Sequence, residues 1–279
     1  MTHLLIVNAD DYGHTPGVSE GIRRAHLQGI VTSTTAMMNR PAAVSELPVA
    51  QADCPGLGLG VHLVLTTGTP VLPAEKVPSL VDDEGRFHHR DPFIERLTTL
   101  NLEEAAAEWH AQVDLFVKTT GQLPDHLDSH HHCSYFTPAL FERMLFLAEE
   151  LRCPIRNPYA DVTCPVADYL PGGQAEADLQ AVAVLINKFK PRTPRRFFSN
   201  FYDEGVSLEA LGTLLHQVTL FPADQTCELM CHPAVVDAEL REVSDYHDMR
   251  AHELTVLTNP KLPLLLQGMQ IELASFSLT

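Results

Sequence analysis

The sequence has few basic residues, no long apolar run and no phosphate-cradling glycine loop. In 279 residues, 19 lysines and arginines stand against 36 aspartates and glutamates, a formal net charge of −17. That charge disfavours nucleic acid and anionic membrane surfaces as partners, and it suits a neutral or cationic small molecule. No stretch approaches the ~20 apolar residues of a membrane-spanning helix. We therefore expect neither a nucleic-acid nor a membrane partner.

Other absences narrow the class of protein further. The N-terminus lacks the basic region and cleavage site of a signal peptide, which predicts a cytoplasmic protein. The 6 cysteines show no disulfide-framework spacing, so we expect reduced core residues. There is no Gly-x-Ser-x-Gly elbow and no dinucleotide fingerprint, so nothing indicates a covalent nucleophile. No linker or repeat divides the chain, which predicts a single domain over residues 1–279.

What the sequence does contain is a repeated alternation of strand-like and helical patterns. Such alternation predicts a parallel sheet, and seven or eight units favour closure into a barrel. A segment at about 66–100, rich in proline, glycine and charge, is expected to be a long excursion that forms a lid or part of a cleft. The predicted strands are 4–9, 30–38, 57–65, 126–132, 154–156, 195–201, 227–232 and 270–276, and the predicted helices are 17–28, 42–51, 102–119, 138–150, 176–188, 208–217 and 247–257.

The most informative stretch is residues 126–132, which contains four histidines and an aspartate. In an extended chain, side chains alternate between two faces. A face of imidazoles and a carboxylate does not pack a core, whereas these groups are ready ligands for a divalent ion. A histidine-rich surface loop is the alternative, but the run lies mid-chain with a strict period of two. The alternation places His126, Asp128, His130 and His132 on one face and Leu127, Ser129 and His131 on the other, so His131 should be dispensable.

Asp10 and Asp11 follow a predicted strand directly. Adjacent carboxylates repel one another, so the pair needs a cation or hydrogen-bond donors nearby. With a divalent ion, one could ligate while the other acts as a base; an Asx turn is the alternative. Neighbours on a strand point to opposite faces, so the strand's end must turn one of them inward, and the sequence leaves open which.

Three more polar residues fall at predicted strand ends, where a barrel enzyme collects its chemistry. His62 shares its face with glycines that leave room around it, although a satisfied core histidine is the alternative. His232 precedes a proline that would stop the strand and present the imidazole at the rim. Arg156 could neutralise a carboxylate, hold an oxyanion or lie on the surface. Together these residues suit a hydrolase in which a metal activates water against a carbonyl.

Five ordered motifs resemble the YdjC/ChbG-type carbohydrate deacetylases. The resemblance implies an α/β fold, an irregular TIM-like (β/α) barrel of about seven strands. It also implies hydrolysis of the N-acetyl group of an N-acetylglucosamine unit in chitooligosaccharides such as diacetylchitobiose. The motifs are Ile6-Val7-Asn8-Ala9-Asp10-Asp11-Tyr12-Gly13, Gly29-Ile30-Val31-Thr32-Ser33-Thr34-Thr35-Ala36-Met37, Gly60-Val61-His62-Leu63, His126-Leu127-Asp128-Ser129-His130-His131-His132 and Met230-Cys231-His232-Pro233-Ala234.

Carried over by position, the resemblance implies roles for single residues. Asp11, His62 and His130 would bind the metal, Asp10 would be the general base, and His232 a second catalytic residue. The resemblance implies Mg²⁺, whereas histidine ligation favours Zn²⁺ or another transition ion. Rival functions are hydrolysis of another acylated amino sugar or glycolipid, and metal or sugar binding without turnover. The sequence leaves open whether the chain forms a homodimer. Candidate substrate-binding residues are His132, Asp128, Arg156 and Arg250.

Overall fold

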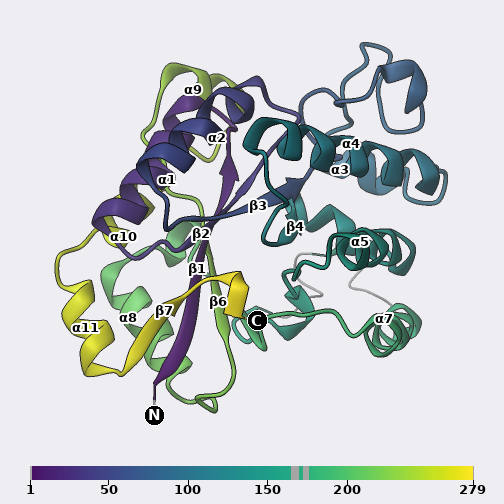
Figure 1. Cartoon of the computed structure of the whole chain (residues 1–279). Helices are drawn as coiled ribbons and strands as arrows, with labels where there is room; N and C mark the ends of the chain where they lie inside the picture. Colours follow the sequence, from purple (N-terminus) through teal and green to yellow (C-terminus); the bar gives the residue numbers. More distant parts are fainter. Residues whose placement is uncertain (1, 165–169, 172–175, 279) are drawn as a thin grey trace.

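The longest strand, β1 (His3–Tyr12), lies at the centre of a curled parallel sheet in the computed structural model, which describes residues 2–164, 170–171 and 176–278 (Figure 1). The strand order is β4-β3-β2-β1-β6-β5, and β7 pairs with the first half of β1. Because β6 pairs along the middle of β1, strands β7 and β2 share its other edge. The other strands are β2 (Ser33–Ala36), β3 (Gly58–Leu63), β4 (Leu127–Ser129), β5 (Arg196–Phe198), β6 (Cys227–Cys231) and β7 (Ile271–Ala274).

The central strands are apolar because both of their faces are covered. Eight consecutive residues of β1 are buried, as is all of β6. A parallel sheet needs such cover, since its crossover helices pack against it. The helices surround the curled sheet on its outer side in Figure 1. The core and the framework of the site are therefore built by the same strands.

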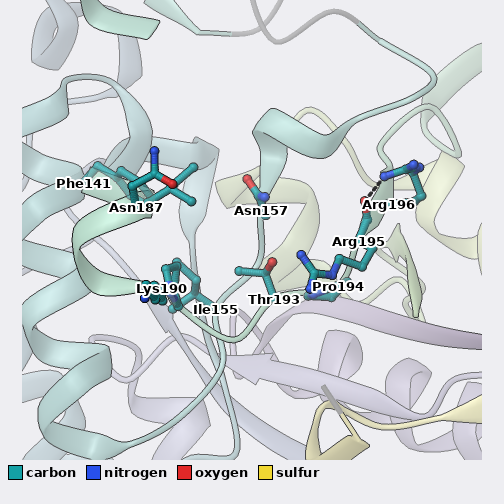
Figure 2. A pocket seen from close by; sticks show the side chains of 11 residues that line it. Phe141, Ile155, Asn157, Asn187, Lys190, Thr193, Pro194, Arg195 and Arg196 are labelled. Carbon is teal, nitrogen blue, oxygen red and sulfur yellow. Dashed lines mark hydrogen bonds between the residues drawn. The ribbon is translucent and has the colours of Figure 1, made fainter. Parts of the chain in front are cut away.

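The sheet does not close continuously between β4 and β5. A short segment bridges the gap instead, with Ile155 paired to Leu127 of β4 and Asp161 paired to Phe197 of β5. The predicted strand at 154–156 is thus reduced to a single bridge. The predicted irregular TIM-like barrel is confirmed, as a half-barrel of parallel strands. Beside this junction, a cavity opens between two helices and the chain that enters β5 (Figure 2).

The predicted helices all occur, with boundaries shifted by a few residues. Capping residues set the ends of these helices, as in α4 (Leu102–Thr120). The Asn101 side chain accepts a hydrogen bond from the Glu103 amide at the start of α4, and Gly121 ends the helix in the left-handed region at φ 73°. Three short helices were not predicted: α3 (Arg90–Glu95), α9 (Ala238–Val243) and α11 (Leu262–Gly268). The other α-helices of the described residues are α1 (Pro16–Gln28), α2 (Pro41–Asp53), α5 (Pro138–Leu151), α7 (Glu176–Phe189), α8 (Leu208–Val218) and α10 (Asp248–Leu257).

The excursion at 66–100 is fastened to α4 rather than loose. The buried Glu108 carboxylate accepts hydrogen bonds from the Val71 amide at 2.8 Å and the Leu72 amide at 3.0 Å. The excursion also supplies Thr67 and His89 to the wall of the large pocket described below. It therefore forms part of a cleft.

All 6 cysteines are free thiols, and five of them are buried, as expected for reduced core residues. In the part of the chain that the structure describes, no helix is both long and apolar enough to cross a membrane.

Candidate active site

The carboxyl end of β1 carries an extra residue that turns two adjacent carboxylates toward one pocket. The pairing register with β2 shifts between Ala9 and Tyr12. Asp11 adopts the left-handed conformation there, at φ 71°, which is unusual for a residue with a side chain. In a regular strand Asp10 and Asp11 would point to opposite faces, but here both line a cavity of about 750 Å³. Bulges that re-aim side chains in this way are common beside active sites.

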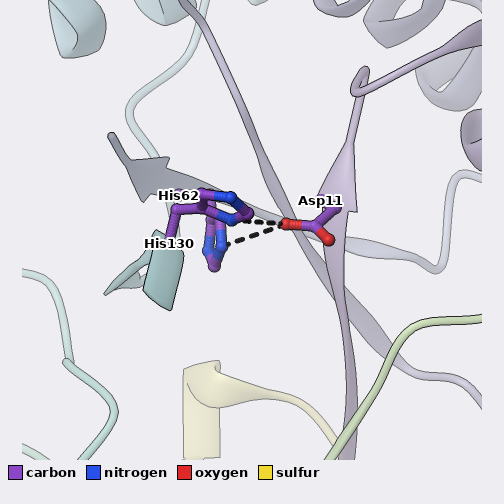
Figure 3. Close-up of side chains that lie close together, drawn as sticks. All are labelled: Asp11, His62 and His130. Atoms are coloured by element: carbon purple, nitrogen blue, oxygen red, sulfur yellow. Dashed lines mark hydrogen bonds and ion pairs between the residues drawn. The ribbon is translucent and has the colours of Figure 1, made fainter. Parts of the chain in front are cut away.

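Three side chains from three elements converge at the floor of this pocket (Figure 3). One oxygen of Asp11, Oδ1, lies 3.3 Å from His62 Nε2 and 3.0 Å from His130 Nδ1. The donor atoms of all three lie within 4.8 Å of one another, and all three side chains are buried. Two imidazoles and one carboxylate form a ligand set that fits a divalent ion. The structure thus brings together the three residues that the family resemblance assigns to the metal.

A second carboxylate fixes the ring of His62. Asp128 Oδ1 lies 2.6 Å from His62 Nδ1, and the Thr35 hydroxyl donates to Asp128 Oδ2 at 3.0 Å. This leaves Nε2 facing Asp11, as in the carboxylate–histidine pairs that orient metal ligands. Burial opposes charge on this imidazole, yet the neighbouring Asp128 and Asp11 raise the pKa of His62 to about 10. A divalent ion at Nε2 would take the place of that proton.

Arg250 holds the other oxygen of Asp11. Its Nη2 donates to Asp11 Oδ2 at 2.6 Å, and its Nε donates to the backbone carbonyl of Tyr246 at 2.9 Å. Burial alone would raise the pKa of Asp11, but the Arg250 guanidinium and His130 hold it well below its usual range. Arg250 also lines the pocket, and its Nη1 has no hydrogen-bond partner among the described residues.

Asp10 forms a bidentate ion pair with a fully buried arginine. Arg156 donates from Nη1 and Nη2 to the two oxygens of Asp10 at 2.6 and 2.7 Å, and from Nε to Glu228 at 2.7 Å. Its Nη1 also lies 3.0 Å from Asp128. Burial would raise the pKa of Asp10, but Arg156 outweighs it and keeps the carboxylate ionised. One guanidinium thus balances three buried carboxylates, so Arg156 is not the surface residue that one interpretation allowed.

Removal of this guanidinium should therefore destabilise the fold. We expect Arg156→Met to lower the free energy of unfolding by ~3–5 kcal/mol, because it leaves the buried carboxylates without a compensating positive charge. Urea unfolding measures this, with Lys188→Met as the control. Lys188 is exposed and pairs with Glu142 at the surface, so its loss should change little. Equal unfolding midpoints for Arg156→Met and the wild type would contradict the balance described here.

His232 lies close to two buried carboxylates, Asp10 and Glu253. Its Nε2 is 4.0 Å from Asp10 Oδ2, and its Nδ1 is 3.9 Å from Glu253 Oε1. Glu253 accepts from the backbone amide of His232 and from the Tyr246 hydroxyl, the latter at 2.6 Å. The sequence suggests Glu228, deeper on the same strand, as the buried carboxylate near His232. In the structure, Glu228 instead accepts a hydrogen bond from Arg156, and the carboxylate near His232 is Glu253 of α10.

Burial favours the neutral form of both His232 and Glu253. It raises the pKa of Glu253 to about 8 and lowers the pKa of His232 to about 4. His232 Nδ1 is buried without a hydrogen-bond partner among the described residues, so it remains free to accept a proton.

The predicted strand at 126–132 is wrong in its second half. Strand β4 ends at Ser129, and the segment η2 (His130–Tyr135) turns, with His131 at φ 53° and His132 at φ 57°. The two-face alternation therefore stops at Ser129, and His131 does not point away. It lines the pocket, with Nδ1 3.1 Å from the Thr66 hydroxyl and its ring centroid 3.9 Å from that of His130.

This correction changes the expected phenotype of His131. We expect His131→Ala to retain metal and to raise KM about tenfold with little change in kcat, because the exposed ring lines the pocket without belonging to the ligand cluster. Metal content by mass spectrometry and steady-state kinetics measure both quantities. An unchanged KM would restore the view that the side chain is dispensable.

The candidate substrate-binding residues divide into two groups. His132 and Arg250 line the pocket, whereas Asp128 and Arg156 are absent from its lining and 0% exposed. We infer that the latter two position His62 and Asp10 rather than contact a substrate. The family resemblance extends to the segment that contains Tyr246 and Glu253, but sequence reasoning assigned these two residues no role in the site, and it did not mark His14 or Tyr202.

Comparison with known proteins places this geometry in a family. The family description "YdjC-like protein" matches residues 4–268. The chain belongs to the YdjC-like family. A carbohydrate deacetylase of Enterococcus faecalis is 38% identical over 274 residues, covering 98% of this chain and 96% of the relative. A carbohydrate deacetylase of Geobacillus stearothermophilus is 37% identical over 262 residues, covering 94% and 92%.

A solved structure agrees with this membership of the YdjC-like family. A protein of Enterococcus faecalis V583, provisionally described as a cellobiose-phosphate cleavage protein, superposes with a TM-score of 0.86. It is 35% identical, and the match covers 99% of this chain and 98% of that one. The resemblance drawn from the five motifs is thus confirmed at the level of the family and the fold.

Proposed function

We propose that this chain is a metal-dependent carbohydrate N-deacetylase that removes acetate from an N-acetylglucosamine unit of a chitooligosaccharide such as diacetylchitobiose. The YdjC-like relatives with carbohydrate deacetylase names support the reaction class. The acidic surface suits a neutral sugar and a cationic amine product. The substrate, the metal dependence and the residue roles below are parts of the proposal.

One arrangement carries the proposal: an ionised carboxylate lies close both to a candidate metal ligand and to a second imidazole. Asp10 shares the pocket with Asp11, His62 and His130, its carboxylate lies within 4.8 Å of a ring nitrogen of His62, and it lies 4.0 Å from His232 Nε2. The pocket of about 750 Å³ falls within the range of ~300–1,000 Å³ typical of small-molecule sites. Binding alone would require neither a spare carboxylate nor a spare imidazole, so the arrangement favours a hydrolase over a non-catalytic barrel.

Each group has a task in amide hydrolysis. A divalent ion held by Asp11, His62 and His130 would lower the pKa of a water molecule and polarise the acetyl carbonyl. Asp10 accepts the proton that this water loses as its oxygen adds to the carbonyl carbon. When the C–N bond breaks, His232 donates its Nε2 proton to the leaving nitrogen. Glu253 can return a proton to Nδ1, and the products are acetate and a free amine.

His232 should therefore matter most where the leaving group needs a proton. We expect His232→Ala to keep its metal and fold and to lose about 10²–10⁴ in kcat on an amide, the usual value of general acid–base catalysis. On an activated acetate ester, whose leaving group needs no proton, the loss should be much smaller. An equal loss on both substrates would show that His232 positions the substrate or an oxyanion instead.

Acetate release from diacetylchitobiose tests the proposed function. We expect release by the metal-loaded protein, loss of release with a chelator, and recovery when metal is returned. The resemblance favours Mg²⁺, while two imidazole donors favour Zn²⁺ or another transition ion, so recovery is measured for each ion separately. Faster turnover of another acylated amino sugar or glycolipid would replace the substrate. No turnover on any amide or ester would favour the binding-only alternative.

A further inference from the structure

A basic segment interrupts this acidic protein far from its catalytic pocket. Residues 188–196, with the sequence Lys-Phe-Lys-Pro-Arg-Thr-Pro-Arg-Arg, contain five of the 19 lysines and arginines of the chain. The segment runs from the end of α7 into β5. In a chain with 36 acidic residues, such a concentration of positive charge would ordinarily be neutralised by nearby carboxylates.

Lys188 is the only one of these five cations with a carboxylate partner among the described residues, and two of the other four have no side-chain partner of any kind there. Lys188 pairs with Glu142 at 2.9 Å, and Arg196 donates to the Arg195 carbonyl and stacks over Phe221 at 4.7 Å. Lys190 and Arg195 form no ion pair with any carboxylate in the described ranges. Both side chains border the same cavity, whose volume is about 390 Å³.

The polar lining of this cavity complements the two cations. Figure 2 shows Asn157 and Thr193 between Lys190 on one side and Arg195 on the other. The Oδ1 of Asn157 is buried and accepts no hydrogen bond from any described residue. A buried acceptor without a donor is costly, so it calls for a ligand hydroxyl or a water molecule. The two cations would bind an anionic group, and the free acceptor would bind a hydroxyl group. A ligand that carries both groups therefore fits this cavity.

The cavity is separate from the catalytic pocket. Its basic residues precede β5, so they lie at the amino ends of the parallel strands, whereas the catalytic residues lie at or beyond the carboxyl ends. No residue lining this cavity also lines the catalytic pocket. The two are nevertheless connected, because the amide of Ile155 donates to the Arg192 carbonyl at 3.0 Å and Arg156 follows directly.

We propose that this cavity binds a small phosphate ester that carries hydroxyl groups. Lys190 and Arg195 neutralise the phosphate, and Asn157 accepts a hydrogen bond from a ligand hydroxyl. The volume, about 390 Å³, accommodates a small molecule rather than a folded partner. Because Asn157 adjoins Arg156, which grips Asp10, a bound ligand would contact the segment that positions the proposed base.

Isothermal titration calorimetry with glycerol 3-phosphate tests the site on the full chain after chelation, which removes any contribution from a metal. We expect saturable 1:1 binding to the wild type. Lys190→Ala/Arg195→Ala should weaken it about 10- to 100-fold, as expected for the loss of two charged contacts. The matched control is Arg86→Ala/Arg241→Ala, which removes the same charge from arginines that are already paired with carboxylates. It should bind as the wild type does.

A second comparison isolates the hydroxyl contact. Wild-type protein should prefer glycerol 3-phosphate to inorganic phosphate, and Asn157→Ala should lose that preference while still binding inorganic phosphate. Three results would overturn the proposal: no saturable binding to the wild type, equal affinity in Lys190→Ala/Arg195→Ala, or loss of binding in His130→Ala. The last would place the ligand in the catalytic pocket. A preference that survives Asn157→Ala would remove Asn157 from the site.

Discussion

Replacement of His130 or His62 by alanine should abolish both metal retention and turnover. Each contributes one ring nitrogen beside Asp11 Oδ1, at 3.0 Å from His130 and 3.3 Å from His62. Loss of one of three protein ligands leaves too few donors to hold a divalent ion at the concentrations of an assay. Metal content by mass spectrometry and acetate release should therefore fall together.

His130→Ala is the cleaner of the two variants. His62 also contacts Asp128, so its loss disturbs the buried ion-pair network around Arg156. His130 contacts Asp11 alone among the buried carboxylates. His110→Ala is the control, because His110 is exposed on α4 and its one ion pair among the described residues is with the surface residue Glu150. Full metal occupancy in His130→Ala would refute the assignment of the ligand cluster.

A thermal measurement gives a readout independent of activity. A ligand that binds only the native state raises its stability by mass action. Addition of a chelator should therefore lower the Tm of the wild type and of His110→Ala, but it should leave His130→Ala unchanged. A chelator-induced shift of the same size in all three proteins would mean that the metal binds elsewhere.

Asp10→Asn is expected to retain metal while it loses about 10²–10⁴ in kcat. An amide cannot accept the proton of the attacking water, and that magnitude is typical of a lost general base. Asp11→Asn should instead weaken metal binding first, because Asp11 Oδ1 faces both histidines. Kinetics at saturating substrate, measured with metal stoichiometry, separate the two carboxylates. The reverse pattern would exchange their roles.

The control for Asp10→Asn is Glu228→Gln. Both carboxylates accept from Arg156, but Glu228 is absent from the pocket lining and cannot touch a substrate. If Asp10 acts as a base, Glu228→Gln should keep kcat within about tenfold of the wild type. If Glu228→Gln loses as much activity as Asp10→Asn, then both act through the placement of Arg156, and Asp10 is not the base.

The candidate site was predictable where the residues follow strand order. The strand–helix alternation implied that polar residues at the carboxyl ends of parallel strands gather at one edge, whereas the ligand roles of Asp11, His62 and His130 came from the family resemblance. The same argument could not say which of Asp10 and Asp11 turns toward the histidines. That choice follows from the bulge in β1, whose register depends on how β2 pairs with it.

Local sequence patterns could not predict side-chain partners that come from distant segments. Glu253 reaches His232 from α10, and Arg156 reaches Asp10 across 146 residues of sequence. A charged side chain that is buried away from water needs a partner of opposite charge or a hydrogen bond. The residues next to it in the sequence do not indicate which distant residue supplies that partner.

The sequence by itself determined the alternation of strands and helices, and it placed the chemistry at the strand ends. It could do so because hydrophobic periodicity and residue type are local properties. Only the tertiary structure decided that β4 stops at Ser129, that His131 and His132 turn in left-handed conformation, and that one buried guanidinium balances three carboxylates. These features depend on contacts between residues far apart in the chain, where packing and desolvation override local preference.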